Sequence, residues 1–259
     1  MPTPYLIIEN LHKKFPRPGD QPLNVISGLN VSVEEGALLS ILGPSGCGKS
    51  TLLNIINGLD SATSGRVVVH GQEVSIKTRS KVKIGVVFQQ PRLLNWRSVR
   101  DNVRIPLDEL GVPAAEANER VEKYLKLVGL GDFMDYYPLQ LSGGMQQRVS
   151  LARGLAIEPD LLLADEPFSA LDEISARKLR QEFVRIWAAT GRTILFVTHN
   201  IREAVFLSTR MLVISARPAQ MFMDLSLDIP HPRAPEDDAL FEIEKNVTRD
   251  FMRMEEAAS

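Results

Sequence analysis

The segment Leu38-Leu-Ser-Ile-Leu-Gly-Pro-Ser-Gly-Cys-Gly-Lys-Ser50 joins a short apolar run to a glycine-rich loop. Its second part, Gly43–Ser50, matches the phosphate-loop pattern G-x-x-x-x-G-K-[ST]. The run Leu38–Leu42 is typical of a buried strand, and the apolar spacing of Thr51–Ile56 is typical of a helix. Strand, loop and helix in this order form the context that the motif requires. The segment therefore predicts a phosphate-binding site at a strand end in an α/β fold.

The residue types in this loop follow from the chemistry of phosphate binding. Backbone N–H groups wrap the phosphate chain, and a side chain on Gly46 or Gly48 would block that approach or need an unfavourable φ. The helix that begins near Lys49 adds N–H groups and a positive dipole end. Lys49 would neutralise the β- and γ-phosphates and the Ser50 hydroxyl would ligate Mg²⁺, although a glycine turn with an incidental lysine is the alternative. The predicted nucleotide-binding residues of the loop are Gly43, Pro44, Ser45, Gly46, Cys47, Gly48, Lys49, Ser50 and Thr51.

Length and composition limit the class of protein. The chain has 259 residues, of which 44% are hydrophobic, enough for a full core in one domain with a lobe. Charged residues make up 24% and the net charge is -2, so no basic field favours nucleic acid as a partner. The sequence has neither an apolar run long enough to span a membrane nor a secretion signal at its start, which predicts a cytoplasmic protein. The single cysteine, Cys47, cannot form an internal disulfide and is interpreted as a small spacer.

Three further apolar runs resemble the one before the loop. They are Ile84–Phe88, Leu161–Ala164 and Thr193–Val197. Each is short and bounded by turn residues, which is typical of parallel strands buried on both faces. Segments with helical spacing lie between them, and Gly191 stands where the C-terminal cap of one such helix would. The alternation predicts an α/β fold with a mainly parallel sheet.

The remaining parts of the chain depart from this alternation. From about Gln90 to Arg148 strand character is weak and helical spacing dominates, which predicts a helical lobe inserted into the sheet domain. After Arg217 the chain is rich in proline and charge, and an amphipathic pattern over Ala239–Met254 then indicates a helix in an appended tail. We expect a single domain over 1–259, with a nucleotide-binding core of 1–89 and 149–217, a helical subdomain of 90–148 and a C-terminal tail of 218–259.

Two adjacent carboxylates, Asp165 and Glu166, follow the apolar run Leu161–Ala164. Because successive residues of a strand point to opposite sides, the two acids can take different tasks at its end. Asp165 would lie in the shell of Mg²⁺, and Glu166 would polarise the attacking water. The alternative is a strand end with two solvated acids.

A second glycine-containing helix start lies in Leu141-Ser-Gly-Gly-Met-Gln-Gln-Arg148. Ser142 is a natural N-cap, with Gly143 and Gly144 in the first turn of the helix. An unhindered helix N-terminus can bind a phosphate. A capped helix without a ligand is the alternative.

These motifs in combination resemble one family. The octapeptide LSGGMQQR resembles the signature of the ATP-binding-cassette (ABC) family, and its place between the phosphate loop and Asp165-Glu166 is that family's order. The resemblance covers Leu6 to Arg217. It implies an ATPase that uses ATP and Mg²⁺. It also implies a P-loop NTPase core with a mainly parallel sheet, an antiparallel N-terminal β subdomain and an inserted helical subdomain.

Other positions match family elements one by one. Gln89 resembles the Q-loop glutamine, which in the family senses Mg²⁺ and the γ-phosphate, and His199 resembles the switch histidine that contacts the γ-phosphate. Asp172 ends the segment SALD, which resembles the D-loop. Phe15 stands where the family carries an aromatic residue that stacks on adenine, here by stacking alone because Phe lacks a hydroxyl. Each has an alternative: Gln89 could be a polar residue at a strand end, and His199 could be structural. The SALD segment could be the N-cap and first turn of a helix, and Phe15 could be a core residue.

The resemblance assigns a role to each of these residues. The catalytic residues it implies are Glu166, His199, Gln89 and Lys49. The Mg²⁺ ligands it implies are Ser50, Gln89 and Asp165. Beyond the phosphate loop, the nucleotide-binding residues it implies are Phe15, Ser142, Gly143, Gly144, Gln146 and Asp172.

The resemblance also implies partners. In the family two such subunits form a head-to-tail homodimer, with ATP between the phosphate loop of one and the signature helix of the other. We expect this dimer to work with two integral-membrane permease subunits, and indirectly with a periplasmic or surface substrate-binding protein. The chain would then be a peripheral protein on the cytoplasmic face of the inner (cell) membrane, without a nucleic-acid partner.

Two stretches resemble the ATPase subunits of nitrate, sulfonate and taurine importers: PRLLNWRSVRDNV and HNIREAVFLSTRMLVISARPAQ. The tail after Arg217 is too short for the regulatory barrel of some sugar-importer ATPases, which supports this assignment by exclusion. One alternative is the motor of an exporter, because the cassette alone discriminates poorly between the two directions. Another is an ABC ATPase that acts on nucleic acid or ribosomes, although such proteins usually carry two cassettes, coiled-coil insertions or basic extensions.

Overall fold

The structure, a computed structural model, describes residues 4–78, 81–234 and 237–257. The chain forms two compact units, one of Met1–Val82 with Thr193–Ser259 and one of Lys83–Arg192. The range 90–148, expected as a helical subdomain, falls inside the second unit. No helix within the described residues combines the length and apolar character needed to cross a bilayer.

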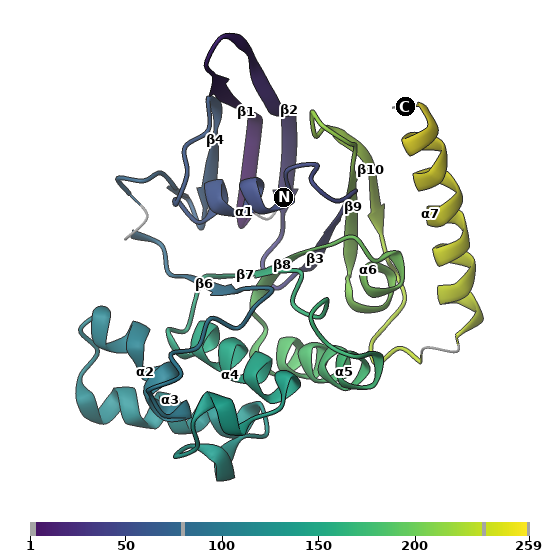
Figure 1. Cartoon of the computed structure of the whole chain (residues 1–259). Helices are drawn as coiled ribbons and strands as arrows, with labels where there is room; N and C mark the ends of the chain where they lie inside the picture. Colours follow the sequence, from purple (N-terminus) through teal and green to yellow (C-terminus); the bar gives the residue numbers. More distant parts are fainter. Residues whose placement is uncertain (1–3, 79–80, 235–236, 258–259) are drawn as a thin grey trace. The chain divides into compact units, whose positions relative to one another are not determined.

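The first unit begins with an antiparallel sheet (Figure 1). Its strands in spatial order are β2 (Asp20–Val33), β1 (Leu6–Arg17), β4 (Ser64–Val69) and β5 (Gln72–Glu73). Leu6 in β1 lies opposite Val33 of β2 and Val69 of β4, and all three side chains are buried. This sheet confirms the antiparallel N-terminal β subdomain.

The other sheet of this unit is mainly parallel. Its strands in spatial order are β10 (Met221–Ser226), β9 (Arg210–Ile214), β3 (Leu38–Leu42) and β8 (Thr193–Thr198). Among these strands only the edge strand β10 pairs antiparallel, with β9. β3 is parallel to β8 and β9, with Leu38 opposite Ile194 and Leu39 opposite Arg210. Every residue of β3 is buried, which explains its nearly continuous apolar run. The helix α1 (Lys49–Ile56) begins after the loop that follows β3.

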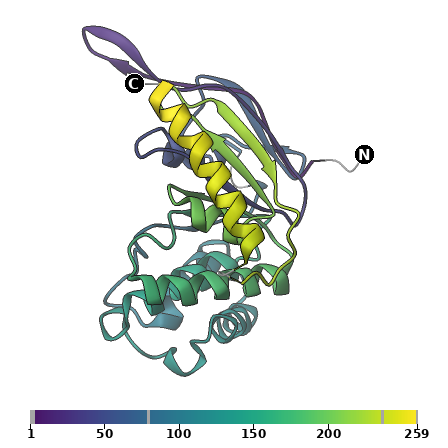
Figure 2. The ribbon, with the colours of Figure 1, turned by 90° about the vertical axis from the view of Figure 1, so that its right-hand side faces the viewer.

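The C-terminal segment packs on the same unit. The helices α6 (Ile201–Leu207) and α7 (Asp238–Ala257) share an apolar cluster with β9, to which Leu240, Val247 and Met254 contribute from α7. Figure 2 shows α7 running along the hairpin of β9 and β10. The buried Arg233 fixes the chain before α7, because it donates to backbone carbonyls of five other residues, Val205, Phe206, Ser208, Leu227 and Ile229. The predicted amphipathic helix is therefore confirmed.

The second unit joins two parallel strands to a group of helices (Figure 1). Its main elements are β6 (Ile84–Val87), β7 (Leu161–Asp165), α2 (Val99–Glu109), α3 (Ala114–Leu127), α4 (Gly143–Ala156) and α5 (Glu173–Thr190), with short 3-10 helices at Gly131–Phe133 and Pro138–Gln140. Two glycines bring α4 onto β6: a β-carbon on Gly85 would lie only 2.4 Å from the carbonyl oxygen of Gly154. The helix backbone and the strand backbone are therefore in direct contact.

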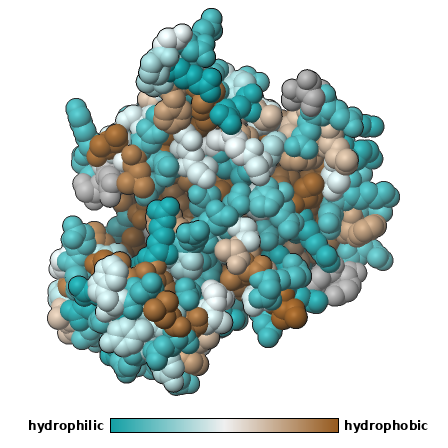
Figure 3. Space-filling view, viewed as in Figure 1, coloured by the Kyte–Doolittle hydropathy of each residue, from teal (hydrophilic) through white to brown (hydrophobic). Residues whose placement is uncertain are grey.

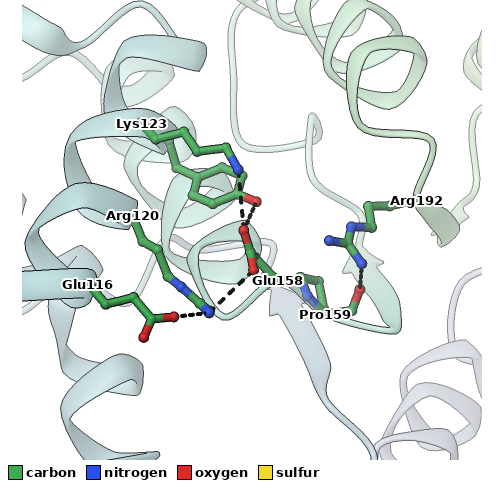
Figure 4. A network of polar contacts seen from close by, with 7 residues as sticks. Glu116, Arg120, Lys123, Glu158, Pro159 and Arg192 are labelled. Carbon is green, nitrogen blue, oxygen red and sulfur yellow. Dashed lines mark hydrogen bonds and ion pairs between the residues drawn. The ribbon is translucent and has the colours of Figure 1, made fainter. Parts of the chain in front are cut away.

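A polar network fixes α3 to the turn after α4 (Figure 4). Glu158 accepts from Lys123 at 3.2 Å and forms an ion pair with Arg120 at 3.4 Å, and Arg120 also pairs with Glu116. Burial alone would raise the pKa of the Glu158 carboxyl, but the hydrogen bond from Lys123 and the charge of Arg120 lower that pKa overall. The network joins α3 to the turn after α4, a contact that the helical spacing of the sequence does not predict.

Candidate functional site

The phosphate loop needs glycine both for its backbone conformation and because neighbouring side chains leave no room for a β-carbon. Gly46 has φ +74 and Gly48 has φ +120, a region that residues with a β-carbon rarely adopt. A β-carbon on Gly48 would lie 2.7 Å from Cγ1 of Val25, and one on Gly43 would lie 2.7 Å from Cγ1 of Ile214. The loop is therefore built against β2 and β9, and neither Gly43 nor Gly48 can be replaced without displacing neighbours.

The start of α1 is open to an anion. Gly48 is the N-cap, no side chain caps the first turn, and that turn contains no acidic residue. Lys49 is buried and its Nζ donates to the carbonyl oxygens of Gly43 at 2.8 Å and Pro44 at 2.9 Å, so the lysine folds back along the loop. Backbone N–H groups, a helix dipole and an ammonium group therefore converge, which is the environment that an anhydride phosphate chain requires.

Cys47 lies inside this loop and is buried. Burial raises the pKa of its thiol above the usual range, although the nearby charge of Lys49 acts in the opposite direction. A thiol with a raised pKa stays neutral and unreactive near neutral pH. This agrees with its interpretation as a spacer.

His199 is exposed at the end of β8, next to the strand that leads into the phosphate loop. The N–H of Gly43 donates to the carbonyl oxygen of Thr198 at 3.4 Å, which joins the two strand ends. The Thr198 hydroxyl donates to the buried Glu203 at 2.8 Å, and Asn200 caps α6. These contacts hold the backbone on both sides of His199.

Phe15 lies on β1 with about a third of its surface exposed, 36%. The amine of Lys13 is 4.5 Å from the centre of its ring, and the same amine donates to Asp60 at 2.6 Å. One face of the ring therefore carries a cation–π contact. The adenine-stacking role of Phe15 stays a prediction.

In the second unit, Asp165 ends β7 and Glu166 begins the following loop. Glu166 has φ +42, which costs a residue with a β-carbon about 1–2 kcal/mol. The loop is held by Ser169, because its N–H donates to the carbonyl oxygen of Glu166 at 3.2 Å and its hydroxyl donates to the same oxygen at 2.9 Å. Ser169 therefore stabilises the strained turn that carries the predicted catalytic carboxylate.

Gln89 is joined to this turn. Its amide Nε2 donates to the hydroxyl of Ser169 at 3.0 Å, so one hydroxyl links the predicted Q-loop glutamine to the backbone of Glu166. Sequence analysis included Ser169 only as the first residue of the segment SALD, which resembles the D-loop, and gave it no task of its own. The sequence shows only that a hydroxyl lies near the two acids. Its link to Gln89 could not be predicted, because the two residues are distant in the chain.

Ser142 is the N-cap of α4, and its hydroxyl accepts from the N–H of Met145 at 3.3 Å. Gly143 and Gly144 form the first turn, as predicted. The amide of Gln146 donates to the carbonyl oxygens of two residues before the helix, Pro138 and Leu141, at 3.0 and 3.2 Å. Gln146 therefore fixes the loop that leads into α4.

Sequence analysis also missed Gln147. This buried residue donates from Nε2 to the carbonyl oxygen of Phe88 at 2.9 Å, which ties α4 to the residue before Gln89. Arg153, six residues further along α4, donates to the carbonyl oxygens of Pro91 and Arg92 at 2.7 and 3.0 Å. The signature helix therefore holds the backbone on both sides of Gln89.

Asp172 is the N-cap of α5 and accepts from the N–H of Ser175 at 3.0 Å. This hydrogen bond lowers the pKa of the Asp172 carboxyl. The capping alternative for Asp172 is therefore observed, and its contact with nucleotide stays a prediction.

The predicted site residues divide between the two units. The first unit brings together the loop from Gly43 to Thr51 and His199, and it also contains Phe15. The second unit contains Gln89, Ser142, Gly143, Gly144, Gln146, Asp165, Glu166 and Asp172. Within it, Ser169 joins Gln89 to Glu166.

Residues 26–169, which include the phosphate loop, the signature segment and the two acids, match the family model described as ABC transporter. The chain belongs to this family. An uncharacterized ABC transporter ATP-binding protein of Methanocaldococcus jannaschii is 45% identical over 88% of this chain and 84% of its own length. A taurine import ATP-binding protein of Roseobacter denitrificans is 40% identical over 86% of this chain and 85% of its own length.

A solved structure supports both the fold and the activity of this ABC ATPase. The ATP-binding cassette MJ0796, solved as a dimer in a post-hydrolysis state with ADP and Pi, is 33% identical and matches with a TM-score of 0.74. The match covers 87% of this chain and 100% of that one. The chain is therefore an ABC-type ATPase that binds and hydrolyses ATP, on a P-loop NTPase fold.

Proposed function

We propose that this ABC ATPase drives the import of a small solute that carries an oxyanion group, such as a sulfonate, taurine or nitrate. The observation that carries the proposal is the 40% identity, over most of both chains, to a protein named for taurine import. ATP binding would close a homodimer and hydrolysis would reopen it, and this motion would pass to two membrane permease subunits. The chain would work as a peripheral protein on the cytoplasmic face of the cell membrane, with a substrate-binding protein supplying the solute.

Each predicted residue has a task in this function. Lys49 binds the phosphate charge, Glu166 polarises the attacking water and His199 orients the γ-phosphate. Ser50, Gln89 and Asp165 offer hydroxyl, amide and carboxylate oxygens, which are the donors that Mg²⁺ prefers. These residues fit Mg²⁺, which when bound would neutralise charge on the β- and γ-phosphates.

The dimeric state of MJ0796 supports a homodimer for this chain. Ser142 and Gly143 are exposed at the start of α4, so they can meet a phosphate held by the partner subunit. The capping hydroxyl of Ser142 has only a long hydrogen bond, 3.3 Å, to give up in that exchange.

The helices of the second unit offer a surface for the permease. Trp96 and Leu110, at either end of the α2 region, are 75% and 54% exposed. Figure 3 shows hydrophobic side chains gathered among polar ones over this group of helices. Large exposed apolar side chains are typical of interaction sites. We expect Trp96→Glu to reduce association with the permease and to leave the basal ATPase rate within about twofold, and unchanged co-purification would contradict this surface.

Complementation tests the shared site. A Lys49→Ala chain and a Ser142→Arg chain should each be inactive as homodimers, because every site then has one defective element. In mixed dimers one site collects both defects and the other pairs an intact Lys49 with an intact Ser142. We expect this site to trap one nucleotide per dimer, with partial return of ATPase activity. Verified heterodimers that neither trap nucleotide nor hydrolyse ATP would reject the shared site.

Vesicles test the direction and the solute. The chain should be reconstituted with the permease that its neighbouring genes encode, and uptake of labelled taurine, nitrate and an alkanesulfonate should be compared. ATP-dependent movement of an oxyanion solute toward the side that holds the ATPase is the expected result. Movement in the opposite direction would support the exporter alternative instead.

A further inference from the structure

A second cationic side chain reaches the phosphate loop. A β-carbon placed on Gly46 would lie 3.4 Å from Nη2 of Arg217, which is van der Waals distance. Arg217 is exposed and lies in the loop between β9 and β10, far from the phosphate loop in sequence. Its guanidinium group therefore stands beside the glycine at the apex of the loop.

The segment that carries Arg217 is fixed on both sides. Before it, the Ser215 hydroxyl accepts from the N–H of Gln220 at 3.0 Å and donates to the carbonyl oxygen of Pro218 at 3.1 Å. After it, the N–H of Ala219 donates to the carbonyl oxygen of Val25 at 2.8 Å. Val25 is also the residue that packs against Gly48. The two loops therefore rest on the same part of β2, which sets the position of Arg217 relative to the phosphate loop.

The charge of Arg217 is not used elsewhere in the described part of the chain. Among the residues that the structure describes, none forms a hydrogen bond or an ion pair with its guanidinium. Most other exposed arginines among the described residues of this unit, such as Arg66 and Arg249, pair with a carboxylate. Arg217 and Lys49 both act electrostatically on Cys47, so their charges overlap in the phosphate loop.

We propose that Arg217 is a further nucleotide-binding residue, which supplies a second positive charge to the phosphates of a nucleoside di- or triphosphate. A guanidinium suits this task because it keeps its charge and offers several N–H donors to phosphate oxygens. The inference rests on the phosphate loop as the nucleotide site. It adds a residue from the β9–β10 loop, which the sequence motifs of the site do not include.

Titration of the full chain with ADP, AMP and a non-hydrolysable ATP analogue tests this role. We expect Arg217→Gln to weaken binding of ADP and of the analogue about fivefold, and binding of AMP less than twofold, because AMP lacks the phosphates that the loop wraps. Arg217→Lys should restore at least half of the lost affinity. The matched control is Arg253→Gln, which removes one exposed charge from α7 of the same unit and should change no affinity.

The effect should also depend on salt. Between about 50 mM and about 500 mM NaCl, the difference between Arg217→Gln and the unchanged chain should shrink, since an exposed charge is screened. ADP affinity within 1.5-fold for both Arg217 variants, with unchanged thermal melting, would overturn the proposal. Lys49→Ala distinguishes failure of the nucleotide site from failure of the Arg217 proposal. If Lys49→Ala also leaves ADP affinity unchanged, the phosphate-loop assignment itself fails. If ADP affinity falls with Lys49→Ala but not with the Arg217 variants, only the role of Arg217 is rejected.

Discussion

Two helices of this protein have glycine at their start, Gly48 as the N-cap of α1 and Gly143 as the first residue of α4, and their first turns differ in capping. At α1 the N-cap is Gly48 and no side chain accepts from the first turn, whereas at α4 the hydroxyl of Ser142 caps the N–H of Met145. Gly48 has a positive φ and no room for a β-carbon, but Gly144 has ordinary space, with its nearest side-chain atom 3.7 Å from such a carbon. The start of α1 is thus a permanent anion site, and the start of α4 must give up a cap to become one.

The predicted phosphate loop and the predicted catalytic carboxylate lie in different units. The first unit holds a preformed phosphate loop, and the second unit holds Glu166 on a strained turn that side-chain hydrogen bonds maintain. Changes in the phosphate loop should therefore act mainly on nucleotide affinity. Changes at the turn that carries Glu166 should act mainly on turnover.

The largest expected effect separates these two tasks. Glu166→Gln should lower ATP turnover about 1000-fold, because the amide keeps the shape of the carboxylate and cannot activate water. ADP affinity should stay within about twofold, measured by titration calorimetry. Near-normal turnover would show that another group activates the water. A large loss of affinity would break the division between the units.

The next effect compares the two glycines directly. Gly48→Ala should weaken ADP binding about 100-fold or more, because the φ of +120 and the 2.7 Å contact with Val25 force the loop to move. Gly144→Ala should change ADP affinity of the monomer less than twofold, since its β-carbon meets only ordinary contacts. Equal losses at both positions would contradict the contrast. Circular dichroism of both variants checks that they fold.

The link through Ser169 predicts a smaller effect on turnover. Ser169→Ala removes the hydroxyl that joins Gln89 to Glu166, and we expect kcat to fall about tenfold with KM for ATP within about twofold. Ser169→Thr, which keeps the hydroxyl, should recover most of this rate. In a Gln89→Ala background the further loss from Ser169→Ala should be under threefold, as coupled residues are not additive. Full additivity would show that Ser169 acts without Gln89.

Sequence patterns predicted the elements whose conformation is set by residues adjacent in the sequence. The strand before the phosphate loop, the glycines of that loop and the cap at Ser142 each depend on a few consecutive residues, and all were predicted. The positions of Ser169, Gln147 and Arg217 were not, because each acts on a segment that only the folded chain brings near. A hydroxyl, an amide and a guanidinium in a sequence give no sign of which distant backbone they will meet.

The smallest effect concerns the cap of α4. Ser142→Ala should destabilise the fold by about 1 kcal/mol, the usual loss for a serine N-cap, and Ser142→Gly by a few tenths of that. Thermal melting of the nucleotide-free chain measures both. Because Ser142 is exposed and its bond is 3.3 Å long, a loss well above 2 kcal/mol would mean that the cap is stronger than its geometry indicates.

The left-handed backbone of Glu166 has a consequence for how this protein evolves. Asparagine adopts this conformation more easily than glutamate, so a Glu166→Asn chain should melt at a higher temperature while losing its turnover. Selection for stability alone would then favour the loss of glutamate. On its proposed role, the glutamate is kept for catalysis, and descendants freed from that demand should drift first at this position.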